Sequence, residues 1–213
     1  MLAYLQECIP RHPLEDKWGT TADVILTAIA RSTDLTLRGV RGILAEATFE
    51  QVFVPILEAD GWKTAVIVGD QSYDFLIQHD VSPEIKIQVK LQRSETGSPK
   101  LYSPKLLKNM RCLHEAMWVV EVQKTSTGKK SNEDTRPYRS GDFDILAVNL
   151  HPSSGDWKRF VFTVGNWLLP RKDNERLIQI MQPVSATRDE YWTDDLQECI
   201  NRVTAGEKKQ LYT

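Results

Sequence analysis

Strict alternation of apolar and polar residues over positions 85–92, IKIQVKLQ, is the feature that most constrains this chain. Apolar residues take the odd positions and polar residues the even ones, which is the two-residue period of a β-strand. A helix would need a period near 3.6 residues, so this segment cannot bury one side as a helix. The pattern predicts a strand over 85–93 with Gln88 and Lys90 on one face. Such a face is ordinarily exposed to solvent on an antiparallel sheet.

Two segments before this strand predict further strands. Residues 63–69, KTAVIVG, and 72–78, SYDFLIQ, are rich in β-branched and aromatic residues. Asp74 lies inside the second of these runs, where aspartate is disfavoured, so we expect it to face solvent or a site. If the strand at 72–78 pairs with the strand at 85–93 as a hairpin, Asp74 reaches the polar face of the latter across the ladder.

Two helices are predicted upstream, over 22–31 and 35–60, from apolar residues at spacings of three and four. Pro55 should kink the second helix because it lacks an N–H donor, and Gly61 should end it. Glu46 lies beside the apolar stripe of this helix and is either a solvated glutamate or a side chain facing a site. The short polar turn between the helices is compatible with a helix-turn-helix, although packing on the core sheet is the commoner outcome.

After residue 93 the chain alternates polar loops with short apolar segments. Loops are predicted at 94–104 and 123–141, helices at 105–116 and 193–204, and strands at 117–122, 142–150 and 157–164. The last part of the chain is polar. From residue 42 to residue 122 the predicted order is therefore helix, three strands, helix, strand.

Composition excludes several classes of protein. The 213 residues are 41% hydrophobic and 26% charged, with a net charge of −2, so any surface for nucleic acid must be local. Cys8, Cys112 and Cys199 are widely spaced and odd in number, which predicts reduced thiols and a cytoplasmic location. No apolar run has the length of a membrane span, and we find no signal peptide, phosphate-binding glycine loop, zinc-ligand spacing or serine nucleophile motif.

Four features occur in a fixed order between residues 42 and 93: a helix glutamate, a Gly-Trp pair, a strand aspartate and an Ile-Gln-Val-Lys strand. Together they resemble the PD-(D/E)xK nuclease superfamily, which includes type II restriction endonucleases and Holliday-junction resolvases. The resemblance implies an α/β fold with an αβββαβ core, a mixed central sheet flanked by helices. It also implies that Asp74, Gln88 and Glu46 bind Mg²⁺, with Mn²⁺ as a substitute, and that Lys90 positions the attacking water.

The third position of the motif departs from the family pattern, since Gln88 stands where the family has Asp or Glu. Glutamine at this place is similar to what some branches of the family carry. Its amide oxygen is an acceptable ligand for a hard cation. Because the site then has one negative charge fewer, we expect weaker binding of Mg²⁺.

The segment 123–141, QKTSTGKKSNEDTRPYRSG, is polar and basic and is either a surface loop or a loop that contacts DNA. On the second interpretation, DNA contacts come from Arg93, Lys124, Lys129, Lys130, Arg136, Tyr138 and Arg139. Arg136 and Arg139 are the expected base readers, because a guanidinium can contact guanine through two hydrogen bonds. Asp142 and Asp144, which follow the loop, are either a second metal site or, as we expect, residues that cap a turn or bind the preceding basic loop.

The resemblance implies a single nuclease domain over 1–213, with a helical addition at 1–41, a catalytic core at 42–122, and a loop, extra strands and a C-terminal helix at 123–213. Its expected activity is Mg²⁺-dependent cleavage of double-stranded DNA at defined sequences by a homodimer, with no membrane association. A restriction enzyme of this kind would have a cognate DNA methyltransferase as partner. The alternatives are a structure-specific junction resolvase, a nicking repair nuclease, or an inactive DNA-binding module in which Gln88 marks the loss of chemistry.

Overall fold

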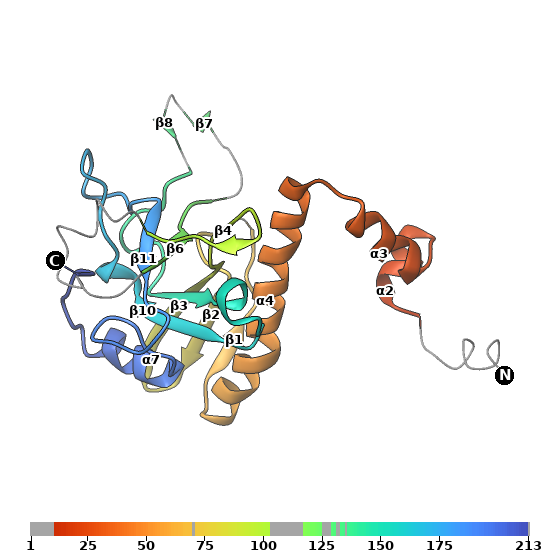
Figure 1. The fold of residues 1–213 in the computed structure, drawn as a ribbon. Coiled ribbons are helices and arrows are strands. Elements are labelled where there is room, and N and C mark those ends of the chain that lie inside the picture. The colour runs from red at the N-terminus through yellow and green to blue at the C-terminus, as the bar shows by residue number, and fades with distance from the viewer. Residues whose placement is uncertain are drawn as a thin grey trace. The chain divides into compact units, whose positions relative to one another are not determined.

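The computed structural model describes residues 11–69, 71–102, 117–124, 129–130, 133–134 and 136–212. The chain divides into two compact units, Met1–Arg41 and Gly42–Thr213 (Figure 1). The helix predicted at 105–116 lies outside the described residues. In the described part of the chain, no helix has the length and apolar character needed to cross a membrane.

The first unit contains helices α2 (Pro13–Trp18) and α3 (Ala22–Ala30) and the first turns of α4 (Asp34–Ala59). Helix α2 begins at a proline, whose fixed φ and missing N–H suit the first helical position. Thr21 caps α3, because its hydroxyl accepts a hydrogen bond from the backbone N–H of Val24 at 3.4 Å.

The second unit is built on a five-stranded sheet with the order β1-β2-β3-β9-β10. Its strands are β1 (Lys63–Ala65), β2 (Phe75–His79), β3 (Ser82–Leu91), β9 (Ile145–Asn149) and β10 (Phe160–Val164). All neighbours pair antiparallel except β3 and β9, which are parallel. Helices α4 and α7 (Leu196–Thr204) flank this sheet (Figure 1). The predicted class, a mixed central sheet with flanking helices, is therefore confirmed.

The core forms where the apolar face of the sheet meets α4. Phe49 of α4 is fully buried, and its ring centroid lies 4.8 Å from that of Phe75 and 5.9 Å from that of Phe160. These contacts pack α4 against β2 and β10, which lie in opposite halves of the sheet. Aromatic rings bury large areas, so the contacts hold the helix on the sheet. All five residues of β9 are buried, as expected for a strand covered on both faces.

Two predicted strand boundaries differ from the structure. The strand expected at 63–69 ends at Ala65, and Val66 beyond it is 89% exposed. The strand expected at 72–78 begins at Phe75, so Asp74 precedes β2 instead of lying inside it. The reason is a hydrogen bond to β3. The backbone N–H of Val89 donates to the Asp74 carboxylate at 2.8 Å, so a side-chain oxygen takes the place of the main-chain oxygen that a paired strand would supply.

The strand predicted at 117–122 is present but lies outside the five-stranded sheet. This segment forms β6 (Trp118–Glu121), which pairs with β11 (Met181–Val184) in a separate two-stranded sheet. The strand that lies parallel to β3 is β9, from much later in the chain. A four-residue apolar run predicts a strand but does not specify its partner, because pairing depends on contacts distant in sequence.

Short elements complete the second unit. They are the strands β4 (Ser94–Glu95), β5 (Ser98–Pro99), β7 (Lys129–Lys130) and β8 (Glu133–Asp134), the short helix α6 (His151–Ser154) and the 3₁₀ turn η1 (Gly165–Trp167). The C-terminal helix α7 is capped by Asp195, whose carboxylate accepts the backbone N–H of Glu198 at 3.1 Å. This helix and the strand β10 were both predicted.

Among the glycines in the described residues, Gly165 is the one at which the chain approaches itself most closely. A β-carbon there would collide with the backbone oxygen and ring of Phe143. We therefore expect Gly165→Ala to lower the free energy of unfolding by about 1–3 kcal/mol, the usual cost of overpacking. Urea denaturation measures the effect. Gly42→Ala is the control, because that site in α4 is open and alanine favours a helix. Equal stability of Gly165→Ala and the unaltered protein would contradict the prediction.

Candidate functional site

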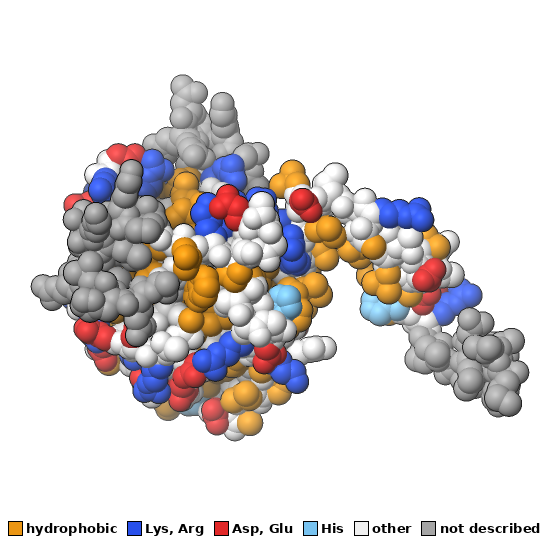
Figure 2. Space-filling model, viewed as in Figure 1, with side chains coloured by type: hydrophobic (Ala, Val, Ile, Leu, Met, Phe, Trp, Pro, Cys, Tyr) orange, Lys and Arg blue, Asp and Glu red, His pale blue; other side chains and the backbone are white. Residues whose placement is uncertain are grey.

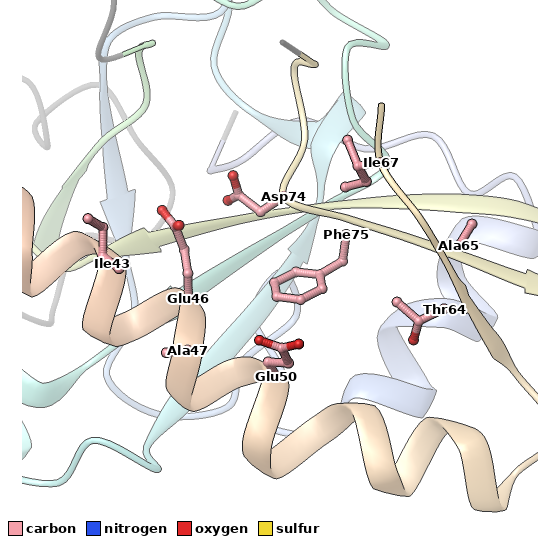
Figure 3. Close-up of a pocket in the computed structure, with 9 residues that line it drawn as sticks. All are labelled: Ile43, Glu46, Ala47, Glu50, Thr64, Ala65, Ile67, Asp74 and Phe75. Carbon is pink, nitrogen blue, oxygen red and sulfur yellow. The ribbon is translucent and has the colours of Figure 1, made fainter. Parts of the chain in front are cut away.

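A cavity of about 440 Å³ lies where α4 faces β1 and the start of β2 (Figure 3). It is lined by Ile43, Glu46, Ala47, Glu50, Thr64, Ala65, Ile67, Asp74 and Phe75. Figure 3 shows the carboxylates of Glu46 and Asp74 near one another, one rising from the helix and the other from the segment before β2. Two of the sequence-predicted site residues therefore meet at this cavity.

Glu46 lies on α4 next to Ala45, which is fully buried, so its side chain leaves the helix at the edge of the buried stripe. It is half-buried, and this loss of solvent is the main cause that raises its pKa to about 7. The negative charge of Asp74 contributes to that rise, whereas the ammonium of Lys90 opposes it. The charge of Glu46 therefore interacts with the charges of Asp74 and Lys90.

Asp74 is held by the strand β3. Its Oδ2 accepts hydrogen bonds from the backbone N–H of Val89, at 2.8 Å, and from the side-chain amide of Gln88. Its own N–H donates to the backbone oxygen of Ile87 at 2.9 Å. Burial raises the pKa of Asp74, while Lys90 and the Val89 N–H lower it. Asp74 is therefore held by three hydrogen bonds to consecutive residues of β3, two through its carboxylate and one through its backbone N–H.

Gln88 is 1% exposed, so the alternative in which the polar face of β3 is in solvent is wrong. Its amide nitrogen donates to Asp74 and to the backbone oxygen of Val89 at 3.1 Å. Its amide oxygen, the atom expected to bind metal, accepts a hydrogen bond from the hydroxyl of Tyr138 at 3.1 Å. In this arrangement Gln88 supports Asp74.

Lys90 lies two residues further along β3 and is half-buried. Its Nζ is 5.6 Å from the ring centroid of Tyr138. Burial lowers the pKa of Lys90, whereas the negative charges of Asp74, Glu46 and Glu121 raise it. The ammonium group of Lys90 therefore interacts with the charges of three acidic side chains.

Glu46 and Asp74 are side chains that could act as carboxylate ligands of a cation. Glu46 and Asp74 are both removed from water, and Asp74 raises the pKa of Glu46, so a cation would stabilise the ionised pair. Within the described ranges, no three His, Cys, Asp or Glu side chains gather as a metal site. Any metal here would therefore take these two carboxylates from the described chain and its remaining ligands from water or substrate.

Several residues predicted to contact DNA have partners within the protein. Arg93 forms an ion pair with Glu121, and both are largely buried. The Nζ of Lys124 lies 4.0 Å from Asp142 and 5.5 Å from the ring centroid of Tyr138. Tyr138 is only 4% exposed, which differs from the surface position that a DNA contact requires.

The other predicted DNA contacts differ in how far they are exposed or described. Arg139 is exposed and Arg136 is half-buried. Lys129 and Lys130 form β7, and their side chains are outside the described structure. Where Figure 2 shows described side chains of the second unit, Lys and Arg are interspersed with acidic and apolar groups. This distribution agrees with a net charge near zero.

Asp142 and Asp144 serve the turn before β9, as we expected. Asp142 accepts the backbone N–H of Arg139 at 3.0 Å, and Asp144 accepts that of Lys86 at 2.8 Å. The backbone N–H of Asp144 also donates to the oxygen of Lys86, at 2.8 Å. The two bonds between Asp144 and Lys86 join the turn to β3, whereas the bond between Asp142 and Arg139 lies within the turn.

Two residues of the site were not recognised from sequence in their observed roles. Tyr138 holds Gln88, and Glu121 raises the pKa of Lys90. The signal for Tyr138 is slight: Pro137 and Tyr138 are an apolar pair inside an otherwise polar loop, and both are buried. For Glu121, at the end of β6, the sequence offers no signal.

Comparison with models of known protein families and with curated protein sequences finds no match. Among solved structures, the chain is similar to a bacterial homing endonuclease, I-Ssp6803I. The TM-score is 0.34 and the identity 21%, over 62% of this chain and 68% of that chain. At this TM-score the likeness assigns neither a family nor an activity to the chain.

Proposed function

We propose that this protein is a Mg²⁺-dependent endonuclease that hydrolyses phosphodiester bonds of double-stranded DNA at defined sequences, as type II restriction enzymes do. The observation that supports the proposal is that Glu46 and Asp74 line one cavity and that the ammonium of Lys90 interacts electrostatically with both carboxylates. Two carboxylates beside one ammonium are the side chains that metal-assisted phosphodiester hydrolysis uses.

The donor set fits Mg²⁺. This ion prefers oxygen ligands and is usually bound through one or two carboxylates together with waters and substrate phosphates. Glu46 and Asp74 would hold it, and Mn²⁺ would substitute because it accepts the same ligands. When bound, Mg²⁺ lowers the pKa of a bound water and stabilises negative charge on the phosphate.

The chain's own residues supply orientation and charge. Lys90, whose pKa is lowered by burial against the opposing effect of the neighbouring acids, would donate a hydrogen bond to the attacking water and stabilise charge developing on the phosphate. Asp74 is kept in position by Val89 and Gln88. Ile67 and Phe75 are among the apolar side chains that line the cavity.

The proposal includes the assembly. Each copy has one such centre, so a homodimer would cut both strands of a duplex. Arg136, Arg139 and Lys124, together with Lys129 and Lys130, would contact DNA, and a cognate methyltransferase would protect the host sequence. These assignments follow from the resemblance to restriction enzymes.

Incubation of the purified protein with unmodified phage DNA and Mg²⁺, Mn²⁺ or EDTA tests the proposal. Discrete fragments that require the metal are the expected result. Cleavage of a four-way junction but not of plain duplex would identify a resolvase instead. Binding without cleavage in any metal would favour an inactive DNA-binding module, the alternative that the hydrogen-bonded Gln88 supports.

Gln88→Glu is expected to destabilise the metal-free protein and to increase its stabilisation by Mg²⁺. The change replaces an amide donor with a carboxylate facing Asp74 and the oxygen of Val89. Loss of these bonds should cost about 1–3 kcal/mol, and the added charge should favour a divalent cation.

Thermal unfolding with and without 10-fold steps of Mg²⁺ measures both effects. Gln88→Met is the matched control, because it removes the amide without adding a charge. A shift on adding Mg²⁺ that is the same in the two variants would contradict the prediction.

A further inference from the structure

Tyr138 approaches the site from a segment 50 residues beyond Gln88. Its ring packs edge-on against Phe143, with centroids 5.3 Å apart and an interplanar angle of 88°. The hydroxyl donates to the amide oxygen of Gln88 at 3.1 Å. Both partners are almost completely buried, so this hydrogen bond is shielded from competing water.

Gln88 in turn is satisfied in one orientation only. Its amide nitrogen faces two acceptors, Oδ2 of Asp74 and the backbone oxygen of Val89, while its amide oxygen faces the donor on Tyr138. Rotation of the amide by 180° would place oxygen against both acceptors, with no donor between them. The hydroxyl of Tyr138 therefore favours the orientation in which Gln88 donates to Asp74.

We propose that Tyr138 is a positioning residue, which orients Gln88 so that its amide holds the carboxylate of Asp74 at the cavity. The consequence for catalysis rests on the proposed nuclease function. The chain Tyr138–Gln88–Asp74 extends from a loop, through β3, to a residue that would bind metal. Partners of this kind orient metal ligands, and their loss typically lowers metal affinity or activity about 10–100-fold.

Tyr138→Phe isolates the hydroxyl from the other contacts of the ring. Phenylalanine keeps the edge contact with Phe143 and the aromatic face near the ammonium groups of Lys90 and Lys124, at 5.6 and 5.5 Å from the ring centroid. It lacks the hydroxyl that donates to Gln88. A change in the behaviour of Gln88 or Asp74 in this variant is therefore a property of that hydrogen bond.

The first test follows the side-chain amide of Gln88 by ¹⁵N NMR, which needs neither metal nor DNA. In the unaltered protein its N–H protons should exchange slowly, because they are buried and bonded to Asp74 and Val89. In Tyr138→Phe we expect exchange at least about tenfold faster, as the amide loses its anchor. An unchanged exchange rate would overturn the proposal.

The second test titrates Mn²⁺ into the protein and measures single-turnover DNA cleavage in a double-mutant cycle with Gln88→Met. Tyr138→Phe should weaken Mn²⁺ binding and slow cleavage by about tenfold. Because Tyr138 acts through Gln88, the double variant should be no worse than Gln88→Met alone. Additive losses would overturn the proposal. If the NMR and Mn²⁺ results appear as expected but no DNA is cut, the positioning role stands and the nuclease function fails.

Discussion

Asp74→Ala is expected to abolish DNA cleavage while leaving folding and DNA binding largely intact. Asp74 is one of three carboxylates that line the cavity, with Glu46 and Glu50, and its loss leaves Glu46 as the remaining acidic ligand of the proposed site. The loss of rate should exceed the about 10–100-fold that follows removal of an outer hydrogen-bonding partner at a metal site. Single-turnover cleavage and gel-shift affinity, measured at one salt concentration, give the two quantities.

Two further variants locate the cause. Asp74→Asn keeps an acceptor for the Val89 N–H but loses the charge, so it should be as inactive as alanine if the charge binds metal. Asp80→Ala should cut normally, because Asp80 is an exposed residue whose ion pair with Lys63 spans 3.3 Å at the surface. Full activity of Asp74→Ala would remove this residue from the site.

Lys90→Ala is expected to bind DNA within a few-fold of the unaltered protein and to cut at least about 100-fold more slowly. A group that orients water acts mainly in the transition state, so its loss lowers the rate far more than the affinity. A lysine that only held a phosphate would instead weaken binding and reduce the salt dependence by about one unit of slope. Comparing rate and affinity for one variant therefore separates the two roles.

Lys86→Ala is the matched control. Lys86 lies on the same face of β3 as Lys90, but its ammonium lies 5.8 Å from the ring centroid of Tyr73. Its removal should change the rate little. If Lys90→Ala loses rate and affinity in equal proportion, Lys90 is a phosphate contact, and Glu121 becomes the next residue to test because its charge acts on Lys90.

Local pattern by itself determined the elements that carry the site. The alternation at 85–92 predicted β3 and placed Gln88 and Lys90 on one face, because side chains of a strand alternate with a period of two. Apolar spacing before β3 predicted the helix that carries Glu46, and the apolar run at 142–150 predicted the strand β9. These features depend on neighbours within a few residues, which the sequence displays directly.

Tertiary structure alone decided what those residues contact. The alternation of β3 is the same whether its polar face contacts solvent or protein. That Gln88 is buried, and bonded to Tyr138 from 50 residues further along the chain, is seen only in the tertiary structure. In the same way, β6 and β9 are both short apolar runs, and their composition does not specify that β9 pairs with β3. Pairing and burial are set by contacts distant in the chain, whose free energy depends on packing that no local pattern records.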